Sequence, residues 1–122
     1  QSNDVVLEAM RKSQLFIFTS VSEDTSTVVL EAISNRLPVV CFDACGMAAV
    51  IDNKVGRKIS LSKPMQSVHD FAKVLKNLER NRDLLKQMSE NCRQRQLELS
   101  WEEKAKTMVE WYEKILRKYQ DA

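Results

Sequence analysis

Glycine, proline and histidine are scarce in this chain of 122 residues, which contains two, two and one of them, respectively. Disordered and collagen-like chains are rich in glycine and proline, so the composition excludes both classes. A zinc site takes about four ligands at motif spacing, and one histidine, His69, with three cysteines does not supply them. We therefore expect a globular chain that binds no metal and needs no cofactor.

The three cysteines, Cys41, Cys45 and Cys92, cannot all pair with one another. Their surroundings look apolar, loop-like and helical, respectively, which favours reduced thiols in a reducing compartment. No apolar run approaches the ~20 residues that span a bilayer, and the first residues lack a signal-peptide pattern. We expect a cytoplasmic protein, and nothing in the sequence indicates membrane association.

A large net charge of either sign is also absent, because the chain contains 19 Lys and Arg and 17 Asp and Glu. The basic residues are scattered along the chain, whereas a nucleic-acid interface requires clustered charge. We expect no nucleic-acid partner. The length suits one domain, residues 1–122.

Residues 1–64 alternate between helix and strand patterns. Helical spacing and capping residues predict helices at 3–13, 27–35 and 46–53. Continuous apolar runs predict strands at 14–20 and 37–44, each buried on both faces, and a short third strand at 56–61. Short crossovers of this kind connect parallel strands, so the fold class is α/β with about three parallel strands and flanking helices.

Residues 65–122 are helical by periodicity and form a C-terminal tail. Ser100 and Glu103 have the spacing of a capping box, which fixes the start of the last helix. The apolar faces of the three helices are Val68, Phe71, Ala72, Leu75 and Leu78; then Leu85, Met88 and Cys92; then Trp101, Ala105, Met108, Val109, Tyr112, Ile115, Leu116 and Tyr119.

The candidate site is the segment from Ser20 to Thr27, which leads from a strand end into a helix. Ligands of parallel α/β sheets bind at such places, and the free amides of a helix N-terminus favour a phosphate. Hydroxyls of Thr25, Ser26 and Thr27 add donors, while Glu31 is placed to accept hydrogen bonds from vicinal hydroxyls such as those of a ribose. Glu23 is placed to reach a hydroxylated group beyond the phosphate.

A plainer interpretation of the same residues remains open. Thr27, Glu31 and Ser34 have the spacing of a solvent-facing stripe, opposite a core face of Val28, Val29, Ala32 and Ile33. Asp24, Thr25 and Ser26 are favoured at helix N-caps without any ligand. Periodicity alone does not decide between the two.

The ordered series of motifs resembles the nucleotide-sugar-binding half of a family 4 retaining glycosyltransferase of the GT-B type. Glu23 and Glu31 have the family's E-x(7)-E spacing, "LPVV" follows at residues 37–40, and Asp43 ends the strand. Val55 and Gly56, and the closing segment "SWEEKAKTMVEWYEKIL", continue the likeness. The resemblance implies a Rossmann-like sheet, here only partial, in a truncated donor-binding domain.

What the resemblance implies is transfer of a hexosyl group from a nucleotide diphosphate sugar, with retention, in polysaccharide or glycolipid biosynthesis. Glu23 would be the catalytic acid beside the donor sugar, and Glu31 would bind the ribose. The donor-binding set would be Asp24, Thr25, Ser26, Thr27 and Glu31, with Ser22 and Gly46 as further candidates. The family uses no divalent metal in this architecture.

Six positions depart from the family pattern. Asp24, Thr25 and Ser26 stand where Gly, Phe and Gly are frequent, which leaves the donor sugar open. Arg36 replaces a helix-ending glycine, at a cost in stability unless Asn35 takes the left-handed conformation. Cys45 replaces a further glycine and Ala49 a glutamate.

The acceptor-binding N-terminal domain of the family has no counterpart in this sequence. We expect the chain to be part of a longer protein, with the missing domain as its partner, and to be inactive alone.

Two other interpretations are kept beside this one. The first is a non-enzymatic receiver-like or flavodoxin-like binding module with a helical tail that docks a partner. The second is a helical interaction module in which Trp101, Trp111 and Tyr119 make the contacts, although aromatic stripes at helical spacing more often belong to a core. In a complete glycosyltransferase the last helix would pack across to the missing domain, so we expect it to expose apolar surface here.

Overall fold

The computed structural model describes residues 3–20 and 27–120, and these form a mixed α/β fold. The order of helices and strands along the chain confirms the predicted α/β class. Each predicted helix and strand is present, with slightly shifted ends. The elements are α1 (Asn3–Lys12), β1 (Phe16–Phe18), α2 (Thr27–Ser34), β2 (Val39–Phe42), α3 (Cys45–Val50), β3 (Gly56–Ile59), α4 (Pro64–Arg80), α5 (Arg82–Glu98) and α6 (Trp101–Gln120).

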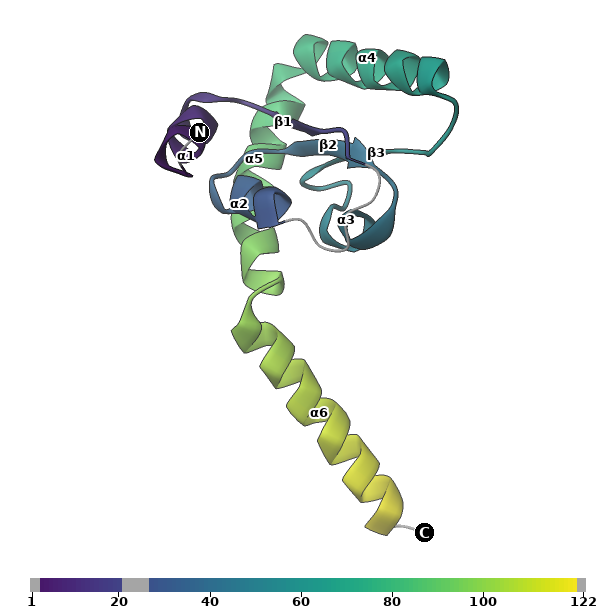
Figure 1. Ribbon diagram of the computed structural model, residues 1–122. Coiled ribbons are helices and arrows are strands. Elements are labelled where there is room, and N and C mark those ends of the chain that lie inside the picture. Colours follow the sequence, from purple (N-terminus) through teal and green to yellow (C-terminus); the bar gives the residue numbers. More distant parts are fainter. Residues whose placement is uncertain (1–2, 21–26, 121–122) are drawn as a thin grey trace.

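The three strands form one parallel sheet in the order β1-β2-β3. Phe16 lies opposite Val39 in the β1–β2 pair, and Val39 lies opposite Gly56 in the β2–β3 pair. A side chain at Gly56 would collide with the backbone carbonyl of Val39, so this glycine permits the strands to approach. Figure 1 shows α2 and α3 on one face of the sheet and α4 on the other.

The central strand β2 is buried throughout and divides the core into two clusters. Val39 and Cys41 belong to the cluster beneath the sheet, whereas Val40 and Phe42 belong to the cluster under α4 and α5. This alternation follows from the pleat of a strand, whose successive side chains point to opposite faces. The long helix α5 contributes to both clusters, with Cys92 in the first and Met88 in the second.

The prediction that the first strand is buried on both faces is wrong at Ile17, which is 44% exposed. Ile17 pairs with Val40, so its side chain lies on the α4 face of the sheet. An apolar groove of about 560 Å³ runs there between Ile17, Phe42 and α4. The groove exists because α4 covers the neighbouring strands and leaves β1 partly open.

The first turns of α4 also depart from the predicted core face. Leu78 is buried, and the Phe71 ring packs edge-on against Phe42 at 5.1 Å between centroids. Val68, however, is 66% exposed and Ala72 is exposed, because both line the open apolar groove beside Ile17 and Phe42. The hydrophobic periodicity therefore overstated how much of α4 contacts the core.

The predicted cap of the last helix is present, since the Glu103 amide donates to Ser100 Oγ at 3.2 Å. Every residue of α6 is exposed, including Trp101 at 84% and Tyr119 at 79%. The expectation that this helix exposes apolar surface is thus confirmed, and the aromatic stripe does not belong to the core. Figure 1 shows α6 extending away from the rest of the fold.

Candidate functional site

The carboxyl ends of the three strands meet at one edge of the sheet, which is where the sequence placed the site. Thr19 and Ser20 follow β1, Asp43 follows β2, and Ser60 follows β3. The amide of Asp43 donates to the carbonyl of Ile59 at 2.8 Å, so the two strand ends stay joined past the last ladder pair. This edge offers polar groups from three separate segments.

Part of the predicted site lies outside the described residues. These candidates are Ser22, Glu23, Asp24, Thr25 and Ser26. Thr27 is the first residue of α2 and is exposed. Gly46 is the second residue of α3 and is half-buried.

Glu31 lies one turn into α2, on the same side of the helix as Thr27. The residue is half-buried, and no hydrogen bond or ion pair joins its carboxylate to another of the described residues. Its backbone carbonyl, in contrast, accepts from both the amide and the side chain of Asn35, at 3.0 and 2.8 Å. A partly buried carboxylate gains much from a donor, so this side chain is well suited to bind a ligand hydroxyl.

The plain solvent stripe does not describe α2 fully. Thr27 and Ser34 are exposed as that interpretation requires, and Ser34 Oγ donates to the carbonyl of Leu30 at 3.0 Å. Glu31 between them is more enclosed than either. The core face is as expected, with Val29, Ala32 and Ile33 buried.

The turn after α2 adopts the conformation that a glycine would favour, at Arg36 rather than at Asn35. Arg36 has φ of 60°, and its amide donates to the carbonyl of Ile33 at 3.0 Å. The Leu37 amide donates to the carbonyl of Ala32 at 2.9 Å, which completes a Schellman motif. The expectation of strain at Arg36 is therefore met, since Asn35 does not take the left-handed position.

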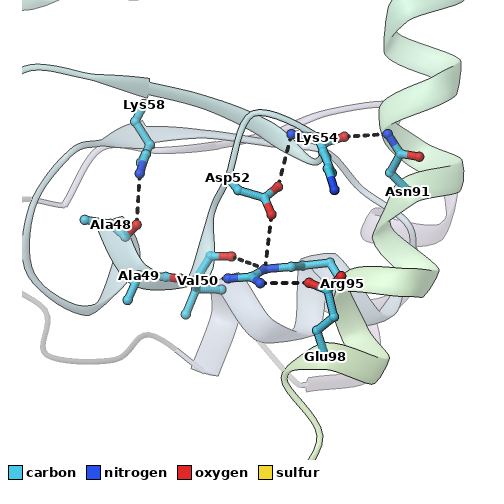
Figure 2. Close-up of polar contacts among 9 residues, drawn as sticks. All are labelled: Ala48, Ala49, Val50, Asp52, Lys54, Lys58, Asn91, Arg95 and Glu98. Carbon is cyan, nitrogen blue, oxygen red and sulfur yellow. Dashed lines mark hydrogen bonds and ion pairs between the residues drawn. The ribbon is translucent and has the colours of Figure 1, made fainter. Parts of the chain in front are cut away.

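The short helix α3 is held at its C-terminal end by cations from two other elements (Figure 2). Lys58 Nζ donates to the carbonyl of Ala48 at 3.0 Å. Arg95 donates from Nη2 to the carbonyl of Ala49 at 2.7 Å and from Nε to the carbonyl of Val50 at 2.9 Å. The last carbonyls of a helix are unsatisfied and carry partial negative charge, so these contacts stabilise and orient α3.

Carboxylates hold both cations in place. Lys58 Nζ lies 3.9 Å from Asp43, whose position follows β2 directly. Arg95 lies 3.7 Å from Asp52 and 2.9 Å from Glu98. These ion pairs connect β3 to the residue that follows β2, and α5 to the segment that follows α3.

Sequence reasoning missed Lys58 and Arg95. Both act on backbone carbonyls, which every residue has, and Arg95 lies more than forty residues after its partners in the chain. Neither feature leaves a pattern in the sequence.

The buried thiols of Cys41 and Cys92 are free and unreactive. Burial raises the pKa of the Cys41 thiol and that of the Cys92 thiol from 9.0 to about 11, with nearby Lys58 opposing the rise at Cys41. A protonated thiol is a poor nucleophile, so neither residue acts as one at neutral pH. Cys45 begins α3 instead of lying in a loop, contrary to expectation.

Two negative findings concern only the part of the chain that the structure describes. Across residues 3–20 and 27–120, no three His, Cys, Asp or Glu residues group so that they could bind a metal ion. Within the same ranges, no helix combines the length and the apolar character needed to cross a membrane.

Comparison with known proteins identifies one family. The family model for glycosyl transferases of group 1 matches residues 1–95, which is most of the chain. No curated protein matches the sequence significantly.

Proposed function

The chain belongs to the group 1 glycosyltransferases, and we propose that it supplies the nucleotide-sugar-binding part of a retaining transferase of family 4. The family membership supports glycosyl transfer over the receiver-like and flavodoxin-like alternatives. The parallel sheet with polar groups at the carboxyl ends of its strands suits a nucleotide ligand.

Glu31 is the residue on which this proposal chiefly rests. Glu31 is half-buried, its carboxylate has no donor among the described residues, and it lies one turn into the helix that follows β1. A carboxylate accepts two hydrogen bonds readily, which matches the vicinal hydroxyls of a ribose. We assign Glu31 to the ribose of the donor nucleotide.

The diphosphate would lie at the N-terminus of α2, near Thr27. The first amides of a helix have no partner within it and favour an anion there. Asp24, Thr25 and Ser26, which precede Thr27 in the chain, and also Ser22, are proposed to contact the phosphates and the sugar. Gly46, at the start of α3, is proposed to border the same site.

Glu23 is proposed as the acid beside the reacting carbon of a hexosyl donor. This assignment rests on the E-x(7)-E spacing to Glu31. Fixed amides and hydroxyls that face a departing diphosphate would stabilise the charge that develops on it, so we propose a reaction that needs no divalent metal.

The acceptor would be bound by another domain of the protein. We propose that the 122 residues alone do not catalyse transfer, because the active site of a two-domain transferase lies between its halves. Free thiols at Cys41 and Cys92 agree with a reducing compartment. We propose a cytoplasmic enzyme of polysaccharide or glycolipid biosynthesis.

The test is donor affinity in the complete protein. Titration calorimetry with uridine and guanosine diphosphate sugars first identifies the donor, and Glu31→Gln is then expected to weaken binding about tenfold, the effect of losing one charged hydrogen bond. Ser34→Ala is the matched control, since Ser34 is exposed one turn further along α2, where its hydroxyl donates to the carbonyl of Leu30 at 3.0 Å and accepts from Gln96 Nε2 at 3.4 Å. Unchanged affinity in Glu31→Gln would remove the ribose assignment.

A further inference from the structure

A second hollow lies at the opposite edge of the sheet, where the strands begin. Ser13 and Gln14 precede β1, Arg36 precedes β2, and the hollow is closed by one face of α5. Its volume is about 320 Å³. Since parallel strands begin at the same edge, this place is separated from the candidate donor site by the length of the sheet.

Among the residues that the structure describes, three cations and no carboxylate line the hollow. The cations are Arg36, Arg82 and Lys86. Arg82 and Lys86 stand four residues apart on α5, a spacing at which like charges repel along a helix. The acid nearest in the chain, Asp83, does not line the hollow. Three positive charges thus lie close together, although their mutual repulsion lowers the stability of the folded chain.

Arg36 lowers the stability of the folded chain in a second way. Its left-handed backbone, with φ of 60°, is one that glycine adopts freely and that an arginine adopts only with strain. The hydrogen bonds of the turn come from backbone groups and from Ser89 Oγ, which donates to the Arg36 carbonyl at 2.6 Å. Among the described residues, the guanidinium of Arg36 makes no hydrogen bond or ion pair in this turn, so the turn itself gives no reason for an arginine at this position.

The remaining polar groups are arranged for an acceptor-rich ligand. Arg82 Nη1 donates to Gln14 Oε1 at 2.7 Å, which orients the guanidinium and leaves its other N–H groups available. The same contact leaves the amide nitrogen of Gln14 as a donor. Guanidinium, ammonium and amide donors around one small space match the oxygens of a phosphate.

From these observations we propose that the hollow binds the phosphate group of a small phosphorylated ligand, at a site separate from the donor nucleotide. Its size suits a phosphomonoester or an inorganic diphosphate. Arg36, Arg82 and Lys86 supply the charge, and Gln14 completes the set of donors.

The experiment measures binding of inorganic phosphate and of pyrophosphate to the complete protein by titration calorimetry, at constant ionic strength set with sodium chloride. Lys86→Gln is expected to weaken binding about tenfold, since one charged contact is lost. Arg36→Gly removes a second cation and also relieves the backbone strain, so it weakens binding in a protein that remains folded. Lys114→Gln is the matched control, because Lys114 is an exposed cation on α6 outside the hollow.

Loss of affinity in Lys86→Gln and Arg36→Gly, with none in Lys114→Gln, supports the site. Donor-sugar affinity should be unchanged in Lys86→Gln, which separates this hollow from the nucleotide pocket. Equal affinity in all variants, equal losses in the control, or no phosphate binding beyond that of chloride would overturn the proposal.

Discussion

Arg95 Nη2 donates to the backbone carbonyl of Ala49 at 2.7 Å, and this contact ties the long helix α5 to the end of α3. The guanidinium reaches Val50 through Nε and is itself neutralised by Asp52 and Glu98. A single side chain thus satisfies two helix-terminal carbonyls. The position of α3 at the candidate site depends on a residue far from that site in the sequence.

Replacement of this arginine should lower stability measurably. Arg95→Met keeps much of the apolar stem but leaves the carbonyls of Ala49 and Val50 without their donor, so we expect a loss of about 1–3 kcal/mol in the free energy of unfolding. Urea denaturation followed by circular dichroism measures it. Arg93→Met is the control, since Arg93 is exposed on the same helix. An equal loss of unfolding free energy in both variants would show that the contacts of Arg95 with the α3 carbonyls do not stabilise the fold.

Arg36→Gly should raise the free energy of unfolding. The left-handed conformation is strained for arginine and free for glycine, so a gain of about 1 kcal/mol is expected despite the greater flexibility of the unfolded chain. Thermal denaturation provides the measurement. Asn35→Gly, one residue earlier, should instead destabilise, because Asn35 bonds to the Glu31 carbonyl and does not have positive φ. Stabilisation by both changes would contradict this account of the turn.

The buried thiols make stability depend on pH in the alkaline range. Burial raises the pKa of Cys41 and of Cys92 to about 11, above their ordinary value of 9.0. The unfolded chain therefore loses these protons first as pH rises, so stability is full below pH 9.0 and falls towards pH 11. The loss is on the order of 2 kcal/mol per thiol.

Other groups titrate in the same range, so a difference between two proteins isolates the thiol. Urea denaturation of the wild type and of Cys92→Ala from about pH 8 to about pH 10, roughly one unit either side of the ordinary thiol pKa of 9.0, should show a shallower alkaline decline in the variant. Parallel declines would exclude a contribution from Cys92.

Removal of α6 should leave the core intact. None of its residues is buried, so a protein ending at Ser100 is expected to lose less than about 1 kcal/mol of unfolding free energy. A protein ending at Gln87 is the contrasting variant, since it lacks the buried Met88 and Cys92 and should not fold. A large loss on removal of α6 alone would mean that the helix contributes to the core.

Periodicity and turn chemistry predicted the α/β class and the approximate place of every helix and strand. The solvent exposure of individual residues was predicted less well. An apolar pattern shows which side chains favour burial, but it does not show whether another element of the fold packs over them. Ile17 and Val68 carry the expected pattern, yet both lie where the described elements provide no covering layer.

For the site, the sequence placed Thr27 and Glu31 on one side of α2, and the structure agrees. Their role stays a prediction, as do the roles of Glu23 to Ser26. The supports from Lys58 and Arg95 were beyond prediction, since their partners are backbone carbonyls brought near only by the tertiary fold.

The full exposure of α6 has an evolutionary consequence. Substitutions along Trp101, Met108, Tyr112 or Ile115 leave the packing of the core untouched, so selection for a stable fold cannot preserve them. If related chains retain this apolar stripe, a contact that α6 makes outside this fold must be what preserves it. Relatives in which polar residues replace the stripe would then be those that have lost this contact.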